Sequence, residues 1–346
     1  MQTCMVSFVM WNLALADEKT IVYIKWAFLI AITVAGIYGI YLMKMEGINP
    51  YINYLSEYFG KKDHSVRFSE LESRLDFSSA SKIQATMSHP MTWTLILNFS
   101  MILVLTLYLK TGNKLFWILI VLVGFNILIS GVRTGIAALV LGFLYFLIRY
   151  RNIKIIILVF LMVVAFGVIV QSNESLSNLF ASFTDVSGNK SDVSGSSISM
   201  RLKQLQGTIN EIKGFEFAGK GYGWTGYYLS MKGIHPVILA FESLIFMILC
   251  NSGIIGLLVW ITFFILLFIL NRRILTIKTD IYLLDTFIIV YAAYATGTGE
   301  YGYMAFFAFF YSFLLVYVSN ETSSIKQIKQ IDFKNKGYIE FELANK

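Results

Sequence analysis

The chain has 346 residues, of which 57% are hydrophobic, 16% aromatic and only 14% charged, and its formal net charge is +7. A mean hydropathy of +0.67 is not that of a soluble domain of this length, so the sequence predicts an integral membrane protein. The basic residues flank apolar spans instead of forming one stripe, which is typical of cytoplasmic anchoring and argues against nucleic-acid binding.

Apolar windows follow one another along most of the chain. Residues 1–16 are apolar but short and carry no Lys or Arg before the apolar run, so we expect a marginal extra span and not a cleaved signal peptide. Eight further windows can cross about 30 Å of hydrocarbon. They are residues 21–43, 91–109, 115–130, 132–148, 154–170, 237–270, 281–296 and 301–319. The predicted fold class is an all-α polytopic membrane protein, a bundle of about 8–10 transmembrane helices.

Window 237–270 is too long for one perpendicular helix, and Asn251, Ser252 and Gly253 interrupt it. A long tilted helix and a broken helix with an interfacial first half both fit this pattern.

Short basic loops set the orientation of the spans. When the spans alternate, one side receives Lys110, Lys114, Arg149, Arg151, Lys154, Arg272, Arg273, Lys278 and the basic tail 320–346. We expect that side to be the cytoplasm. The whole chain, residues 1–346, is expected to form a single integral membrane domain. Its opposite side then receives two long external loops, 44–90 and 171–236, together with the junction 131–133 and the turn 297–300.

The second external loop changes character along its length. Its first part, residues 171–199, is rich in Ser, Asn and Gly and cannot bury enough apolar surface to fold alone. Residues 199–213 then begin with a Ser cap and carry apolar residues at helical spacing, which predicts an amphipathic helix on the membrane surface or over a cavity. The apolar residues are Leu202, Leu205, Ile209 and Ile212.

Arg133 is the most informative single residue, because it lies between two apolar stretches with no acidic residue nearby. An arginine inside hydrocarbon costs about 2.5 to 3.5 kcal/mol, so we expect it at a helix junction that faces water or an anionic ligand. An interfacial anchor that snorkels to the headgroups is the alternative. Gly131 and Gly135 favour a tight reversal that points the guanidinium between helices.

A glycine-rich turn follows in the second loop. Gly221, Gly223 and Gly226 satisfy G-x-G-x-x-G, but a dinucleotide site needs a preceding strand and a following helix, so we reject that interpretation. The exposed amides of this turn, together with Lys220, are candidates for contact with an anion. A plain flexible turn is the alternative.

Four more ionisable residues are candidates. Arg201 lies on the amphipathic helix, where a solvated position is the alternative. His235 lies two residues before window 237–270, and Glu242 is predicted two turns deeper on the same helix face. A carboxylate at such depth is usually paired or functional, and the same holds for Asp285 in window 281–296.

The histidines and cysteines predict no metal site. His64, His89 and His235 lack the spacing of metal ligands. Cys4 and Cys250 lie far apart in apolar sequence, which supports neither a disulfide framework nor a thiolate site.

Taken in chain order, these pieces resemble the bacterial O-antigen polymerase and O-antigen ligase superfamily of membrane glycosyltransferases. The family's Ser-Arg step after a hydrophobic span is matched by Ser130–Gly135, and its arginine-bearing external helix by Ser199–Arg201. Its glycine-rich turn is matched by Gly219–Gly223. Its span that begins with His and reaches G-x-x-G is matched by His235 and Gly253–Gly256.

The resemblance covers about residues 85–270 and implies a GT-C-like fold in the bacterial inner membrane, with the active site facing the periplasm. It implies lipopolysaccharide or other surface polysaccharide synthesis from undecaprenyl diphosphate-linked oligosaccharides, without cofactor or metal. Membrane lipids, a flippase and a chain-length regulator are the expected partners. It also implies site residues of two kinds. The catalytic ones are Arg133, Arg201, His235 and Glu242, and the diphosphate-binding ones are Lys220, Gly221 and Gly223.

Two other functions remain as alternatives to a polymerase. In ligases of the family, the histidine is usually followed by Asn, Ser or Gln, and the glycines lie closer to it in the sequence. Here Pro236 follows His235, so the polymerase branch is preferred over the ligase branch. A lipid-linked oligosaccharide flippase is the alternative class. Alternating access usually comes with inverted repeats and charges along a central path, and this sequence has no such repeat and its charges gather on one side.

Overall fold

The computed structural model describes residues 18–43, 45, 49–52, 54, 83–87, 89–151, 198–241, 243–298 and 303–320. These residues form helices and no strand, with one isolated bridge between His235 and Leu239. The helices are α2 (Glu18–Leu42), α5 (Pro90–Thr111), α6 (Leu115–Ile129), α7 (Arg133–Tyr150), α10 (Ile198–Glu211), α11 (Trp224–Lys232), α12 (Leu244–Ile274), α13 (Lys278–Thr298) and a last helix Tyr303–Asn320.

Six of these helices are long and apolar enough to cross a membrane, namely α2, α5, α7, α12, α13 and Tyr303–Asn320. The apolar α6 is shorter. The all-α polytopic fold class is confirmed, and these helices coincide with predicted windows to within a few residues, except at the start of α12. Residues 1–16 and window 154–170 lie outside the described part of the chain.

Side-chain contacts fix which helix ends lie together. At one end, the Tyr294 hydroxyl of α13 donates to the Met91 carbonyl of α5 (2.6 Å), and Thr94 bonds Ser130 after α6 (2.8 Å). At the other end, the Lys110 ammonium of α5 lies 2.8 Å from Asp280 of α13. The basic ends of the helices therefore gather opposite the Ser130–Arg133 junction, as the alternating spans predicted.

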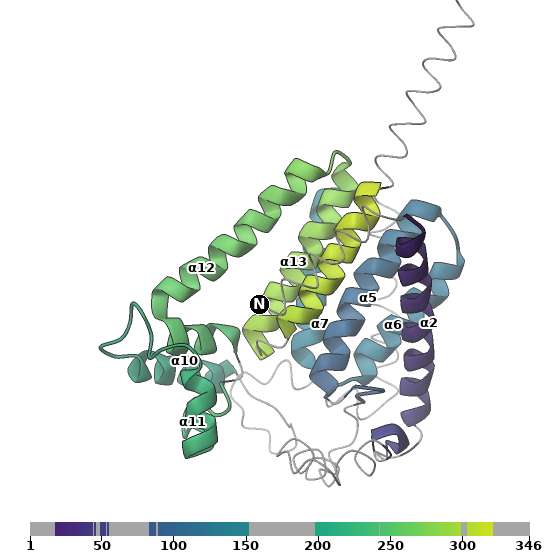
Figure 1. Ribbon diagram of the computed structural model, residues 1–346. Coiled ribbons are helices and arrows are strands. Elements are labelled where there is room, and N and C mark those ends of the chain that lie inside the picture. The colour runs from purple at the N-terminus through teal and green to yellow at the C-terminus, as the bar shows by residue number, and fades with distance from the viewer. Residues whose placement is uncertain are drawn as a thin grey trace, which may run out of the picture.

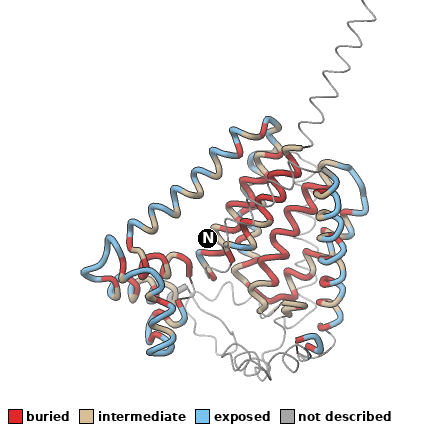
Figure 2. The backbone as a smooth tube through the Cα atoms, in the orientation of Figure 1, coloured by how far each residue is buried: buried red, intermediate tan, exposed pale blue. Residues whose placement is uncertain are grey.

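The bundle is held by close helix contacts and stacked aromatic rings. Gly142 of α7 faces Val290 of α13 so closely that a Cβ would collide with it, which is the small-residue packing that membrane helices use. Phe99 stacks on Phe287 with ring centroids 4.3 Å apart. In Figure 2, α5 and α13 are largely buried, whereas α2 and much of α12 are exposed at the flanks.

Asp285 proves to be part of a buried polar network that joins four helices. Its carboxylate accepts hydrogen bonds from Tyr145 of α7 (2.7 Å), Asn271 (3.0 Å) and Arg272 (2.9 Å) of α12. Tyr311 of the last helix donates to Asn271 (2.6 Å). Asp285 is thus paired at the end opposite Arg133.

The long helix α12 is broken at Gly253, whose φ of 60° and ψ of −157° only glycine adopts without strain. Residues 254–274 alone are long enough to cross the hydrocarbon. Of the two arrangements predicted for this window, the broken helix is the correct one. Figure 1 shows α12 running obliquely from the α10 and α11 region to the far end of the bundle.

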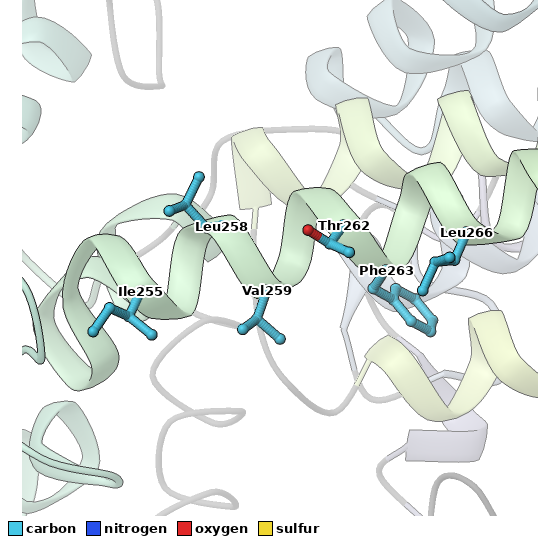
Figure 3. A pocket seen from close by; sticks show the side chains of 6 residues that line it. All are labelled: Ile255, Leu258, Val259, Thr262, Phe263 and Leu266. Atoms are coloured by element: carbon cyan, nitrogen blue, oxygen red, sulfur yellow. The ribbon is translucent and has the colours of Figure 1, made fainter.

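The apolar face of α12 carries a shallow pocket (Figure 3). Its lining residues are Ile255, Leu258, Val259, Thr262, Phe263 and Leu266. All six lie on successive turns of one spanning helix and none is charged. Acyl chains of the bilayer satisfy such a face, so we assign it no substrate.

Candidate functional site

The second external loop folds into a compact unit at the start of α12, which we call the cap (residues 198–252). Figure 1 shows it beside the bundle, at the lower end of α12. Its core is a separate apolar cluster, onto which Trp224, Tyr228 and Leu205 pack. The core residues are Ile212, Ile238, Phe241, Phe246, Leu249 and Cys250. The first part of α12 therefore joins the cap to the bundle, because Phe246, Leu249 and Cys250 pack in the cap core whereas Leu244 and Ile248 pack in the bundle core.

The glycine-rich turn satisfies the backbone groups that the break in α12 leaves open. Broken helices leave carbonyl and amide groups without intrahelical partners. The amides of Lys220 and Gly221 donate to the carbonyls of Cys250 (2.8 Å) and Asn251 (3.1 Å). On the other side of the break, the Ile254 amide donates to the Glu216 carbonyl (2.8 Å).

This arrangement corrects one expectation. The amides of Lys220 and Gly221 are already bonded to α12, so they do not face an anion, and the turn is a structural joint. Gly223, with φ of 82°, is the N-cap residue of α11. Of the predicted diphosphate-binding groups in this turn, the Lys220 side chain is the one that carries charge.

Helix α10 presents a polar stripe to its buried side. Gln204 and Thr208 are fully buried, and Arg201 and Glu211 are partly buried on the same stripe. The predicted apolar face splits: Leu205 and Ile212 join the cap core, whereas Leu202 and Ile209 are 62% and 55% exposed. The predicted helix is confirmed, and its apolar residues share one face beside the polar stripe, but only part of that face is buried.

Arg201 and Gln204 form a pair within this stripe. The Arg201 guanidinium donates to Gln204 Oε1 at 3.0 Å. An arginine has no acceptor, so the oxygen of the Gln204 amide must face it and Nε2 must point away. Within the described part of the chain this buried Nε2 has no acceptor, which costs about 1–3 kcal/mol.

Glu211, at the end of the same stripe, joins two of the predicted site residues. Its Oε1 lies 2.5 Å from Lys220 Nζ, and its Oε2 lies 3.4 Å from His235 Nε2. The hydrogen bond from Lys220 holds the pKa of the Glu211 carboxyl below its usual value, although partial burial opposes this. The Lys220 ammonium also lies over the Trp224 ring, 4.6 Å from its centroid.

His235 is buried at 6% exposure, and its ring is fixed on both sides. Its Nδ1 accepts hydrogen bonds from the amides of Val237 (3.1 Å) and Ile238 (3.0 Å). A nitrogen that accepts two hydrogen bonds carries no proton, so the proton of the neutral ring lies on Nε2, which faces Glu211. His235 is therefore placed as a donor and not as a general base.

The predicted relation between His235 and Glu242 is wrong. Residues 235–241 form turns, with Leu239 and Phe241 at positive φ, and α12 begins only at Leu244. The two residues share no helix face. Glu242 itself lies outside the described residues.

Arg133 is the first residue of α7, directly after the reversal at Gly131 (φ 67°), and is partly buried. It belongs to the bundle, whereas Arg201 belongs to the cap. The start of α7 lies against the end of α13, since Thr134 faces Gly297, and Figure 1 shows α10 at the lower end of α12. The structure thus joins Lys220 and His235 through Glu211, and places Arg133 and Arg201 on two neighbouring bodies.

Sequence reasoning missed Glu211 and Gln204. The spacing of residues 201, 204, 208 and 211 marks one helical stripe, and that signal was present in the sequence. This polar stripe is hard to recognise in the sequence, because each of its residues is followed by an apolar residue of the neighbouring face.

A comparison with known families agrees with this geometry. A family model described as O-antigen ligase matches residues 118–261, which run from α6 to the membrane part of α12. The match includes Arg133 and the whole cap, and it confirms the resemblance to the O-antigen ligase and polymerase superfamily. No curated protein and no solved structure matches the chain.

Proposed function

From its place in the O-antigen ligase and polymerase superfamily, we propose that this multi-pass membrane protein is a surface polysaccharide polymerase. It transfers a glycan from an undecaprenyl diphosphate-linked donor to a sugar hydroxyl of a lipid-linked repeat unit. The reaction takes place at the outer leaflet of the bacterial inner membrane, on the periplasmic side, without metal.

The observation that supports this proposal most is the position of three cations. Arg133 begins α7, and Arg201 and Lys220 lie in the cap, which adjoins the start of α12 and so lies opposite the basic anchors. The positive-inside rule puts those helix ends outside the cytoplasm. A lipid diphosphate lies at the membrane surface, where the bundle and the cap meet.

The chemistry needs positive charge on the leaving group. As the acceptor hydroxyl attacks C1, the bond from C1 to the phosphate oxygen breaks and the diphosphate takes the electron pair. Only interactions that strengthen with this charge lower the barrier. A unit charge at 4 Å contributes about 4 kcal/mol at an effective dielectric of 20, an upper bound of about three decades in rate.

The acceptor hydroxyl also loses a proton. His235 and Glu242 are the two candidates from the sequence. Because Nε2 of His235 is a donor and Nδ1 is taken by the backbone, we propose Glu242 as the proton acceptor. His235 then acts through the hydrogen bond that it donates.

Reconstitution tests the function directly. Purified protein in liposomes receives lipid-linked repeat units and excess chelator, and the products are separated by size. Long chains on one lipid carrier are expected. Movement of the substrate across the bilayer without new bonds would instead support the flippase alternative.

The description of the matching family, O-antigen ligase, favours ligase as the second candidate. The two activities differ in their acceptor, so the same assay distinguishes them. A polymerase extends lipid-linked repeats in the absence of any other acceptor, whereas a ligase transfers only when a lipid A core is added.

A further inference from the structure

We propose that Glu211 is a positioning residue of the transfer site. Its carboxylate holds the Lys220 ammonium in place and orients His235 as a hydrogen-bond donor through Nε2. The catalytic consequence rests on the proposed function, whereas the geometry of the cluster is tested independently of it.

Glu211 joins three separate segments of the cap. It is the last residue of α10, Lys220 lies in the glycine-rich turn, and His235 lies in the turn before α12. Its two oxygens have different partners, with Oε1 bonded to Lys220 and Oε2 facing His235. One carboxylate therefore sets the relative position of two candidate site residues.

The Lys220 side chain needs such a partner. A lysine is a point charge on a flexible four-carbon stem, so its head group is placed only as well as its contacts allow. Here the ammonium is fixed between the Glu211 carboxylate and the Trp224 ring. Without the carboxylate only the ring contact remains, and the charge is free to move away from the diphosphate.

The His235 ring needs the same carboxylate on its other side. The amides of Val237 and Ile238 hold Nδ1 as an acceptor, and Tyr228 lies against the ring with centroids 5.2 Å apart. Glu211 completes this arrangement as the acceptor for the Nε2 proton. The side chain of Glu211 is only 27% exposed, so water competes weakly for its oxygens.

Glu216 provides a matched control. It is a carboxylate in the same cap, and it accepts a hydrogen bond from the Gly214 amide at 2.9 Å. Its pKa is also lowered, chiefly by that backbone hydrogen bond, but its side chain faces water and touches neither Lys220 nor His235. Glu216→Gln therefore removes a cap carboxylate without changing the cluster.

The first measurement is the imidazole spectrum in lipid nanodiscs with ¹⁵N-labelled histidine. The chain has three histidines, so a His235→Gln spectrum assigns the His235 signals, and His64 and His89 are internal references. We expect a protonated Nε2 and an unprotonated Nδ1 in the wild type, with slow exchange of the Nε2 proton. Glu211→Ala accelerates that exchange, and Glu216→Gln leaves it unchanged. An identical exchange rate in wild type and Glu211→Ala overturns the proposal.

The second measurement is the rate of glycan transfer. We expect Glu211→Gln to lower kcat by about 10- to 100-fold at unchanged folding, since small misplacements near the reacting atoms have effects of this size. Glu211→Asp regains part of the loss, because it keeps the charge. A Glu211→Gln rate equal to that of an active wild type refutes the positioning role. An inactive wild type instead refutes the proposed function. In that case the imidazole spectra still test whether Glu211 holds the His235 ring.

Discussion

Gly219 and Gly253 meet where the glycine-rich turn crosses the break in α12. A Cβ built on Gly219 would lie 2.6 Å from the Gly253 nitrogen, and both residues have positive φ. A Cβ on Gly253 would collide with the carbonyl oxygens of Phe217 and Glu216. The cap and the membrane part of α12 are thus joined backbone to backbone.

Substitution of either glycine by alanine is therefore expected to loosen this joint. The backbone conformation alone costs of the order of 1–3 kcal/mol in Gly253→Ala, and the collision adds to it. Gly226→Ala is the control, because nothing lies within 4 Å of its Cβ position and it is helical in α11. Hydrogen exchange of residues 198–252 measures the effect. Equal protection in Gly253→Ala and Gly226→Ala would contradict the joint.

Loss of either arginine is expected to slow transfer strongly while the protein stays folded. We expect Arg133→Ala and Arg201→Ala each to lower the rate by about 10- to 1000-fold, up to the bound set by one charge near the diphosphate. Lysine at either position rescues poorly, because it lacks the planar fork of the guanidinium. The readout is surface polysaccharide in cells that lack the native gene. Long chains at normal expression would show that the substituted arginine is not needed for transfer.

Gln204→Glu is expected to separate stability from activity. The new carboxylate pairs with Arg201 and removes the buried amide donor that has no acceptor in the described structure. The midpoint of thermal unfolding should not fall. A lysine paired with one carboxylate oxygen keeps two further N–H donors, whereas a bidentate carboxylate occupies the planar fork of Arg201. Transfer should therefore decrease in Gln204→Glu, because the fork is no longer open to the diphosphate. Normal transfer by a folded Gln204→Glu variant would show that the Arg201 charge is not used.

Asp285→Ala is expected to destabilise the bundle without a specific effect on chemistry. It leaves the hydrogen-bond donors of Tyr145, Asn271 and Arg272 without their acceptor, and breaking such a buried group costs about 3 kcal/mol or more. The loss is reduced to the extent that Arg272, whose side chain is 47% exposed, turns to water. Denaturant titration measures this loss as a change in the free energy of unfolding. A stable variant with no transfer would instead place Asp285 in the reaction.

The cap is expected to loosen in acid. The folded-state pKa of Glu211 is lowered by Lys220, so its contribution to stability is present above the unfolded value of about 4.3 and is lost as the pH falls through the folded value. The fluorescence of Trp224 is obtained as the difference between the protein and its Trp224→Phe variant, and it should change below about pH 4. In Glu211→Gln this acid transition should be absent. A transition of the same size in both proteins would assign it to another group.

The sequence predicts the membrane helices well, because long apolar runs have few alternatives in hydrocarbon. The start of α12 is different. Residues 237–243 are apolar enough to read as helix, yet the His235 ring binds the amides of Val237 and Ile238 and turns the chain there. Ser243, an N-cap residue type, marked the true start at Leu244.

The candidate site was only partly predictable for a similar reason. Arg201 and His235 stand out by residue type, whereas Glu211 acquires its role from partners 9 and 24 positions away in the sequence. Those contacts depend on how two turns fold around the break at Gly253. No local pattern in the sequence encodes that geometry.

Release of undecaprenyl diphosphate by the purified protein tests the proposed transfer reaction most directly. Lipid-linked repeat units are supplied with chelator and without nucleotide, and the free lipid diphosphate and the lengthened glycan are measured together. We expect one released lipid for each new glycosidic bond, and we expect both products to be lost in the Arg133→Ala, Arg201→Ala double variant. Bond formation that persists in the double variant, or that requires a divalent metal, would contradict the proposed reaction.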